Sequence, residues 1–71
     1  MKVSNNIPET IKEARNKKAL TQLEVGTSCG YSGEIGRVTV ARWEAGSRPV
    51  PLDKLRILAK TLGIKVLDLI P

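Results

Sequence analysis

The side chains of this sequence that could do chemistry are mainly lysines and arginines. They number 12 against 7 aspartates and glutamates in 71 residues, for a formal net charge of +5. There is no histidine, and Cys29 is the only cysteine, so a disulfide framework is excluded and no metal site is predicted. A positive surplus on so small a surface favours a polyanionic partner, nucleic acid first and an anionic membrane second. The charge could also serve solubility alone.

Catalysis and membrane insertion are not expected. The sequence lacks histidine, a glycine-rich phosphate loop and paired acids in a pocket pattern, and 71 residues leave little room for a cleft. It is therefore not predicted to be an enzyme or to hold a cofactor. No stretch approaches the roughly 20 apolar residues of a membrane span, and the N-terminus lacks the apolar region of a signal peptide. The sequence predicts a cytoplasmic protein.

Glycines and prolines divide the chain into short stretches whose apolar residues have helical spacing. These stretches predict a helix over residues 8–18, a second from the Thr21 cap to the stop at Gly30, and three more over 37–45, 51–62 and 65–69. No window alternates with a period of two, so strands are not expected. The prediction is a single all-α domain, residues 1–71, built as a compact five-helix fold.

The second helix, the turn after it and the third helix match the arrangement that reads the major groove of DNA. Thr21-Gln22-Leu23-Glu24 predicts a capping box at the start of the second helix. The two helices of this motif cross closely, and Gly26 supplies the small residue that the crossing needs. Gly30 supplies a turn residue that tolerates positive φ. The apolar residues expected to anchor both helices to the core are Val25, Cys29, Tyr31, Val40 and Trp43.

On these residues the chain resembles the lambda-repressor-like, or Cro/repressor, helix-turn-helix regulators of the xenobiotic-response-element type. The resemblance spans nearly the whole chain and rests on Leu20-Thr21-Gln22, Val25-Gly26, Gly30-Tyr31-Ser32, Val40-Ala41-Arg42-Trp43-Glu44-Ala45-Gly46, Leu55, Leu58-Ala59 and Leu62-Gly63-Ile64. Each fragment is weak alone, but together they follow the family's order and spacing. The resemblance implies a bacterial or phage-encoded transcription regulator, a repressor in particular, that binds a double-stranded DNA operator.

Two positions depart from the family pattern. Seven residues separate Ser32 from Val40 where the family usually has three. The extra segment, Gly33-Glu34-Ile35-Gly36 in the simplest alignment, is predicted to lengthen the turn and to displace a recognition helix that begins near Arg37. Ala19 stands where the family often has a glycine closing the first helix, a change that is predicted to cost little.

The resemblance also implies roles for individual residues. Those implied to contact base edges in the groove are Arg37, Val38, Thr39 and Arg42. Those implied to contact phosphates are Thr21, Gln22, Ser47 and Arg48. Arg15 and Glu44 are implied to form an ion pair that fixes the fold. The simpler interpretation of the arginines is a solvated surface. Glu34 is expected to be solvated or to lie at the N-terminus of the third helix.

The alternative function is an antitoxin or a protein-interaction module on the same fold. A protein-binding face should carry exposed apolar side chains, which Ile35 and Val38 could supply, whereas Arg37, Thr39 and Arg42 favour DNA. Family members commonly bind palindromic operators as dimers, so the resemblance also implies a homodimer. Its contact is expected to use the last helix, with Leu67 the best candidate among Ile64, Val66, Leu67 and Ile70.

Overall fold

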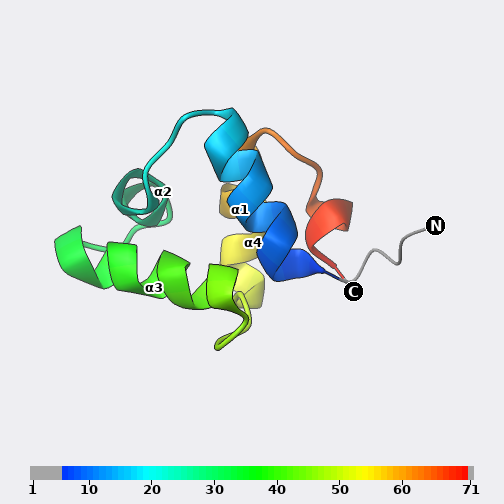
Figure 1. The fold of residues 1–71 in the computed structure, drawn as a ribbon. Coiled ribbons are helices and arrows are strands. Elements are labelled where there is room, and N and C mark those ends of the chain that lie inside the picture. The colour runs from blue at the N-terminus through cyan, green and yellow to red at the C-terminus, as the bar shows by residue number, and fades with distance from the viewer. Residues whose placement is uncertain (1–5, 71) are drawn as a thin grey trace.

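The computed structural model describes residues 6–70, which fold into four α-helices and a final 3₁₀ helix (Figure 1). The elements are α1 (Ile7–Lys17), α2 (Gln22–Ser28), α3 (Gly33–Ala45), α4 (Leu52–Leu62) and the 3₁₀ helix η1 (Val66–Leu69). The described part of the chain contains no strand, and its helical character confirms the all-α prediction. None of its helices has the length and apolar character that a membrane span requires.

The predicted count of five α-helices is wrong, because the last segment closes only a tight 3₁₀ turn. The Asp68 amide donates to the Lys65 carbonyl at 2.9 Å, and the Ile70 amide donates to the Leu67 carbonyl at 3.3 Å. These bonds span three residues, the spacing of a 3₁₀ helix. With only four residues in the segment, no run of α-helical bonds forms.

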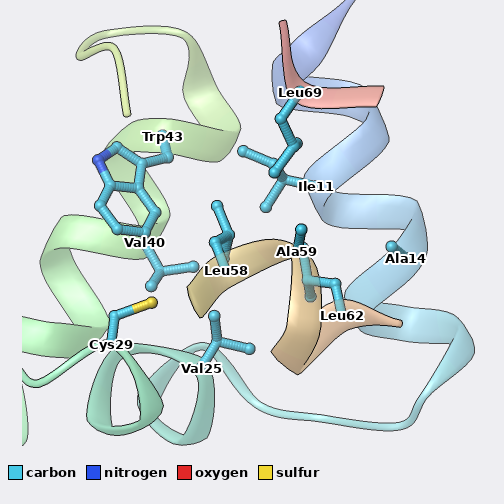
Figure 2. Close-up of a cluster of buried hydrophobic side chains, with 10 residues drawn as sticks. All are labelled: Ile11, Ala14, Val25, Cys29, Val40, Trp43, Leu58, Ala59, Leu62 and Leu69. Carbon is cyan, nitrogen blue, oxygen red and sulfur yellow. The ribbon is translucent and has the colours of Figure 1, made fainter. Parts of the chain in front are cut away.

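A core of ten buried apolar side chains joins all five elements (Figure 2). Its members are Ile11, Ala14, Val25, Cys29, Val40, Trp43, Leu58, Ala59, Leu62 and Leu69. Tyr31, also predicted as an anchor, is half-buried and packs against this cluster. Burial raises the pKa of the Cys29 thiol, and the charge of Lys54 opposes this only in part, so the thiol is protonated at neutral pH. Leu52 is 84% exposed because it opens α4 beyond the edge of the core.

The residues inserted before Arg37 form a helical turn and do not lengthen the loop. α3 begins at Gly33 and runs for 13 residues, so the connection from α2 is confined to residues 29–32. Gly30 adopts φ +95 in this connection, as predicted for the turn. The predictions of a lengthened turn and of a helix starting near Arg37 are therefore wrong.

The physical reason is a contact between the backbones of α2 and α3 at Gly26 and Gly36. A Cβ atom added to Gly26 would lie 2.5 Å from the carbonyl carbon of Gly36, and one added to Gly36 would lie 3.1 Å from the Cα of Gly26. Both glycines are buried within their helices. Glycine costs a helix about 1 kcal/mol relative to alanine. The close packing of the two backbones offsets that cost and holds the inserted turn in helical form.

All four α-helices end in the same left-handed turn, the Schellman motif. In each, an amide beyond the helix donates to a carbonyl five positions earlier: Leu20 to Arg15 at 3.1 Å, Tyr31 to Gly26 at 3.0 Å, Ser47 to Arg42 at 3.0 Å and Ile64 to Ala59 at 3.0 Å. Glycine occupies the left-handed position in three of these turns, but α1 places Ala19 there, with φ 55. A left-handed conformation costs a residue with a Cβ roughly 1–2 kcal/mol. The small cost predicted for Ala19 is revised upward accordingly.

Replacing Ala19 with glycine is expected to raise the free energy of unfolding by about 1 kcal/mol, because the relief of strain exceeds the added entropy of the unfolded chain. Urea denaturation measures the change. The control is Ala45→Gly, at the exposed last residue of α3, which is expected to lower stability. Equal losses in both variants would show that Ala19 is not strained.

Candidate nucleic-acid interface

α3 lies along one edge of the molecule, and its buried residues all lie on one side of the helix (Figure 1). The buried residues on that side are Gly36, Val40 and Trp43. Since an α-helix has 3.6 residues per turn, the outer side carries Ile35, Val38 and Arg42. Ile35 is 65% exposed, Arg42 is exposed and Val38 is half-buried. With 13 residues, α3 is about 20 Å long and presents this side along its length.

A basin of about 220 Å³ beside α3 brings together residues predicted to contact bases and phosphates. Thr39 and Arg42 of α3 line it, together with Arg48 of the following loop. Ser47 is exposed in the same loop, next to Arg48. Within residues 6–70, neither salt bridge engages Arg42 or Arg48. Both guanidinium groups are therefore available to an anionic ligand.

Tyr31 lines the same basin and places a further cation beside it. Its ring meets Trp43 edge-on, with the centroids 6.0 Å apart and the planes at 68°. Lys54 of α4 holds its Nζ 5.1 Å from the Tyr31 ring centroid, within the range of a cation–π contact. Lys54 was not predicted to take part in the site, because only the tertiary fold brings the start of α4 next to the turn.

On the other flank of α3, Glu44 connects three helices. Arg15 Nε donates to Glu44 Oε2 at 2.6 Å, and Arg15 Nη2 donates to Glu44 Oε1 at 3.2 Å. Arg15 Nη1 also donates to the Leu20 carbonyl at 2.8 Å. Gln22 Nε2 completes the cluster by donating to Glu44 Oε1 at 3.1 Å. The Arg15 and Glu44 side chains are only 13% and 5% exposed, so this network fixes α1 and the start of α2 against α3.

Thr21 and Gln22 keep some of their donors free. The Thr21 amide donates to Glu24 Oε1 at 2.8 Å, and Thr21 Oγ1 accepts from the Glu24 amide at 3.0 Å, which confirms the predicted capping box. This box leaves the hydroxyl proton of Thr21 unused. A side-chain amide has two N–H bonds, and Glu44 takes only one of those of Gln22. The hydroxyl of Thr21 and the amide of Gln22 are thus the donors that this corner offers.

Arg37 is exposed, but Glu34 holds its guanidinium from one turn earlier. Arg37 Nε donates to Glu34 Oε2 at 2.8 Å, and Arg37 Nη2 donates to the same oxygen. The hydrogen bond lowers the pKa of the Glu34 carboxyl and raises the pKa of Arg37, so both groups are charged at neutral pH. Glu34 lies in the first turn of α3, one of the two settings expected for it.

The predicted lengthening of the turn by Gly33–Gly36 left Ile35 outside the third helix, whereas the structure includes this segment in α3. A usable signal was present. Gly36, Val40 and Trp43 follow one another at steps of four and three residues, the spacing of a helix face that meets the core. Counting Gly36 as a core position would have extended the third helix by a turn.

The family comparison agrees with this geometry. The model of a helix-turn-helix family matches residues 11–69, which run from within α1 to the end of η1. A search of curated proteins and a search of solved structures found no match. The matched family binds DNA and is not generally enzymatic. Because the match covers most of the chain, the protein belongs to the lambda-repressor-like (Cro/repressor) helix-turn-helix family of DNA-binding transcription regulators.

Proposed function

We propose that the protein is a sequence-specific repressor that places α3 in the major groove of an operator. One observation supports this most directly: the outer side of α3 carries the exposed Arg42, which no salt bridge among residues 6–70 engages, and donors suited to phosphate lie on both flanks of the helix. Gln22 lies on the Glu44 flank, and Arg48 lies on the Thr39 flank. A recognition helix in a groove meets one phosphate backbone on each side. The net charge of +5 adds attraction that is independent of sequence.

Each side chain in this proposal has a chemical role. Arg42 and Arg37 donate in pairs to O6 and N7 of guanine, and Val38 and the Thr39 methyl group contact thymine methyl groups. The phosphate contacts are made by Thr21, Gln22, Ser47 and Arg48. Arg15 and Glu44 hold Gln22 in place and contact no DNA. The protein acts in the cytoplasm, on bacterial or phage DNA.

The repressor is proposed to bind a palindromic operator as a homodimer through the C-terminal region. Leu67 is 75% exposed and Ile70 is 45% exposed, whereas Leu69 is buried. Ile70 and Leu52 also line an apolar hollow of about 570 Å³ that opens beside η1. Burying these side chains between two copies would remove apolar surface from water. Light scattering on the protein bound to operator-length DNA measures how many copies bind each duplex. One copy per duplex excludes the homodimer.

An antitoxin or protein-interaction role is the second candidate, and Ile35 favours it. An isoleucine that is 65% exposed on the outer side of α3 suits an apolar partner. An antitoxin that represses its own operon uses both surfaces. The two roles differ in whether the isolated chain prefers one duplex sequence.

The experiment is a selection of bound sequences from a random duplex library at ~150 mM salt, where non-specific attraction is weak. A repressor enriches one motif, and a palindromic motif with half-sites one helical turn apart agrees with the dimer. Binding without enrichment contradicts specific recognition. If isotope-labelled protein titrated with duplex shows no change at Gln22, Arg37, Thr39 and Arg42, the DNA role is wrong.

A further inference from the structure

The turn inserted at the start of α3 places an acid beside the proposed DNA surface. Gly36 locks this turn against Gly26, so Glu34 and Ile35 are held on a rigid helix. In helix-turn-helix docking, the N-terminal residues of the recognition helix are the ones that reach base edges. Glu34 therefore lies where an arginine or a polar residue would be expected to help binding, and where a carboxylate repels phosphate.

The pair formed by Glu34 and Arg37 adds little to the fold. The two side chains are 69% and 48% exposed. Exposed pairs at this spacing contribute little to stability, since water screens them and two long side chains lose freedom. The main consequence of the contact is that it fixes the orientation of the Arg37 guanidinium.

The hydrogen bonds leave one edge of Arg37 open. Glu34 Oε2 accepts from Nε and Nη2, so no bond within the described residues uses Nη1. A guanidinium has five N–H donors, and the edge formed by Nη1 and the second N–H of Nη2 stays free. Two adjacent donors on one edge are what guanine O6 and N7 accept. The other carboxylate oxygen, Oε1, accepts no bond among these residues and can take one from an exocyclic amine.

We propose that Glu34 is a positioning and specificity-determining residue of the DNA-binding surface. It orients the open edge of Arg37 toward one guanine, and it prevents Arg37 from settling on phosphate oxygens at random sites. Its free oxygen accepts from the N4 amine of a cytosine, the one base for which a carboxylate is a regular groove partner. This inference rests on the proposed DNA-binding function and assigns Glu34 a role that opposes general affinity while it sharpens sequence preference.

The test compares wild-type protein with Glu34→Gln on two duplexes, the selected operator and a scrambled duplex of equal length and composition. Glu34→Gln is expected to bind the scrambled duplex about fivefold more tightly, with a salt slope steeper by about 0.9, because one more cation can neutralise a phosphate. Affinity for the operator is expected to fall about tenfold as Arg37 loses its fixed orientation. If Glu34 is only a solvated side chain, Glu34→Gln will change neither the ratio of operator to scrambled affinity nor the salt dependence of binding.

Two controls make the result specific. Glu13→Gln makes the same change of net charge at an exposed site on α1, and it is expected to leave the ratio of operator to scrambled affinity unchanged. In the Arg37→Ala background, Glu34→Gln is expected to lose less than the tenfold operator affinity that it loses in wild type, because only the direct contact of Glu34 with cytosine is left to remove. Thermal unfolding checks that each variant remains folded.

The outcomes separate this inference from the function on which it rests. If wild-type protein prefers its operator and Glu34→Gln keeps the same preference and salt slope, the role of Glu34 is wrong and the DNA-binding proposal stands. If Glu13→Gln changes the ratio of operator to scrambled affinity as much as Glu34→Gln does, net charge alone explains the effect. That result also overturns the inference. If wild-type protein binds neither duplex, the proposed function itself has failed.

Discussion

Gly26→Ala is expected to lower the free energy of unfolding by about 3 kcal/mol or more, the largest stability loss expected from an alanine at any of the six glycines. The new Cβ would lie 2.5 Å from both the carbonyl carbon and the Cα of Gly36. These atoms belong to the backbone of α3, so no side-chain rotation can make room. α3 must move away from α2, and the core side chains Val40 and Trp43 move with it. Urea denaturation followed by circular dichroism measures the loss.

Gly36→Ala is the matched control, because it adds the same atom from the other side of the same contact. Its Cβ would lie 3.1 Å from the Cα of Gly26 and 3.3 Å from the Tyr31 Cβ, distances that a small shift relieves. Alanine also favours the helix by about 1 kcal/mol over glycine. Gly36→Ala is therefore expected to cost about 1 kcal/mol, well below Gly26→Ala. Equal stability of Gly26→Ala and wild type would mean that α2 and α3 do not pack backbone to backbone.

The parts of the fold that could be predicted from sequence are those that short-range chemistry decides. Thr21 and Glu24 carry the two halves of a capping box within one turn, so the start of α2 was readable. Gly30 predicted the turn because glycine adopts a positive φ at little cost, and it has φ +95 in the structure. The small residue at the close crossing was also readable at Gly26, because every helix pair of this type requires one.

The inserted turn could not be read in the same way, because its conformation depends on a contact between distant backbones. Glycines at both ends of Gly33–Gly36 are poor helix formers, and local propensity favours a loop. The contact of Gly36 with Gly26 reverses that preference. Ala19 is a second such case: its cost was predicted to be small, and the left-handed φ that raises this cost is imposed by the turn that ends α1.

The candidate site divides along the same line. Residues carried over from the family motif, such as Arg42 and Arg48, are found together at one basin. Two contacts at the site depend on the fold and could not be read from the family motif. Lys54 reaches the basin by way of Tyr31, and Glu34 reaches Arg37 only because the insertion is helical. A sequence motif identifies the residues of the site, but it does not show which side chains will form hydrogen bonds or cation–π contacts with them in the fold.

Arg42→Ala is expected to cost the largest share of sequence preference, about 10- to 100-fold at one guanine position of the operator. Arg42 lies on the exposed outer side of α3, it lines the basin shared with Arg48, and no salt bridge among residues 6–70 competes for it. It therefore differs from Arg37, whose guanidinium Glu34 already holds. Fluorescence anisotropy with operators substituted at single base pairs measures the preference position by position.

The matched control is Arg56→Ala, which removes the same side chain from an exposed position on α4. It is expected to weaken all duplexes slightly and equally, because only long-range attraction is lost. If Arg42→Ala behaves in the same uniform way and its salt slope falls by about 1, Arg42 neutralises a phosphate and reads no base. Recognition of the operator's bases would then depend on Arg37 and Glu34, which lie closer to the N-terminus of α3. If Arg42→Ala instead loses affinity at only one base pair, Arg42 makes the main base contact. The inserted turn with Glu34 then makes a second base contact about two helical turns away.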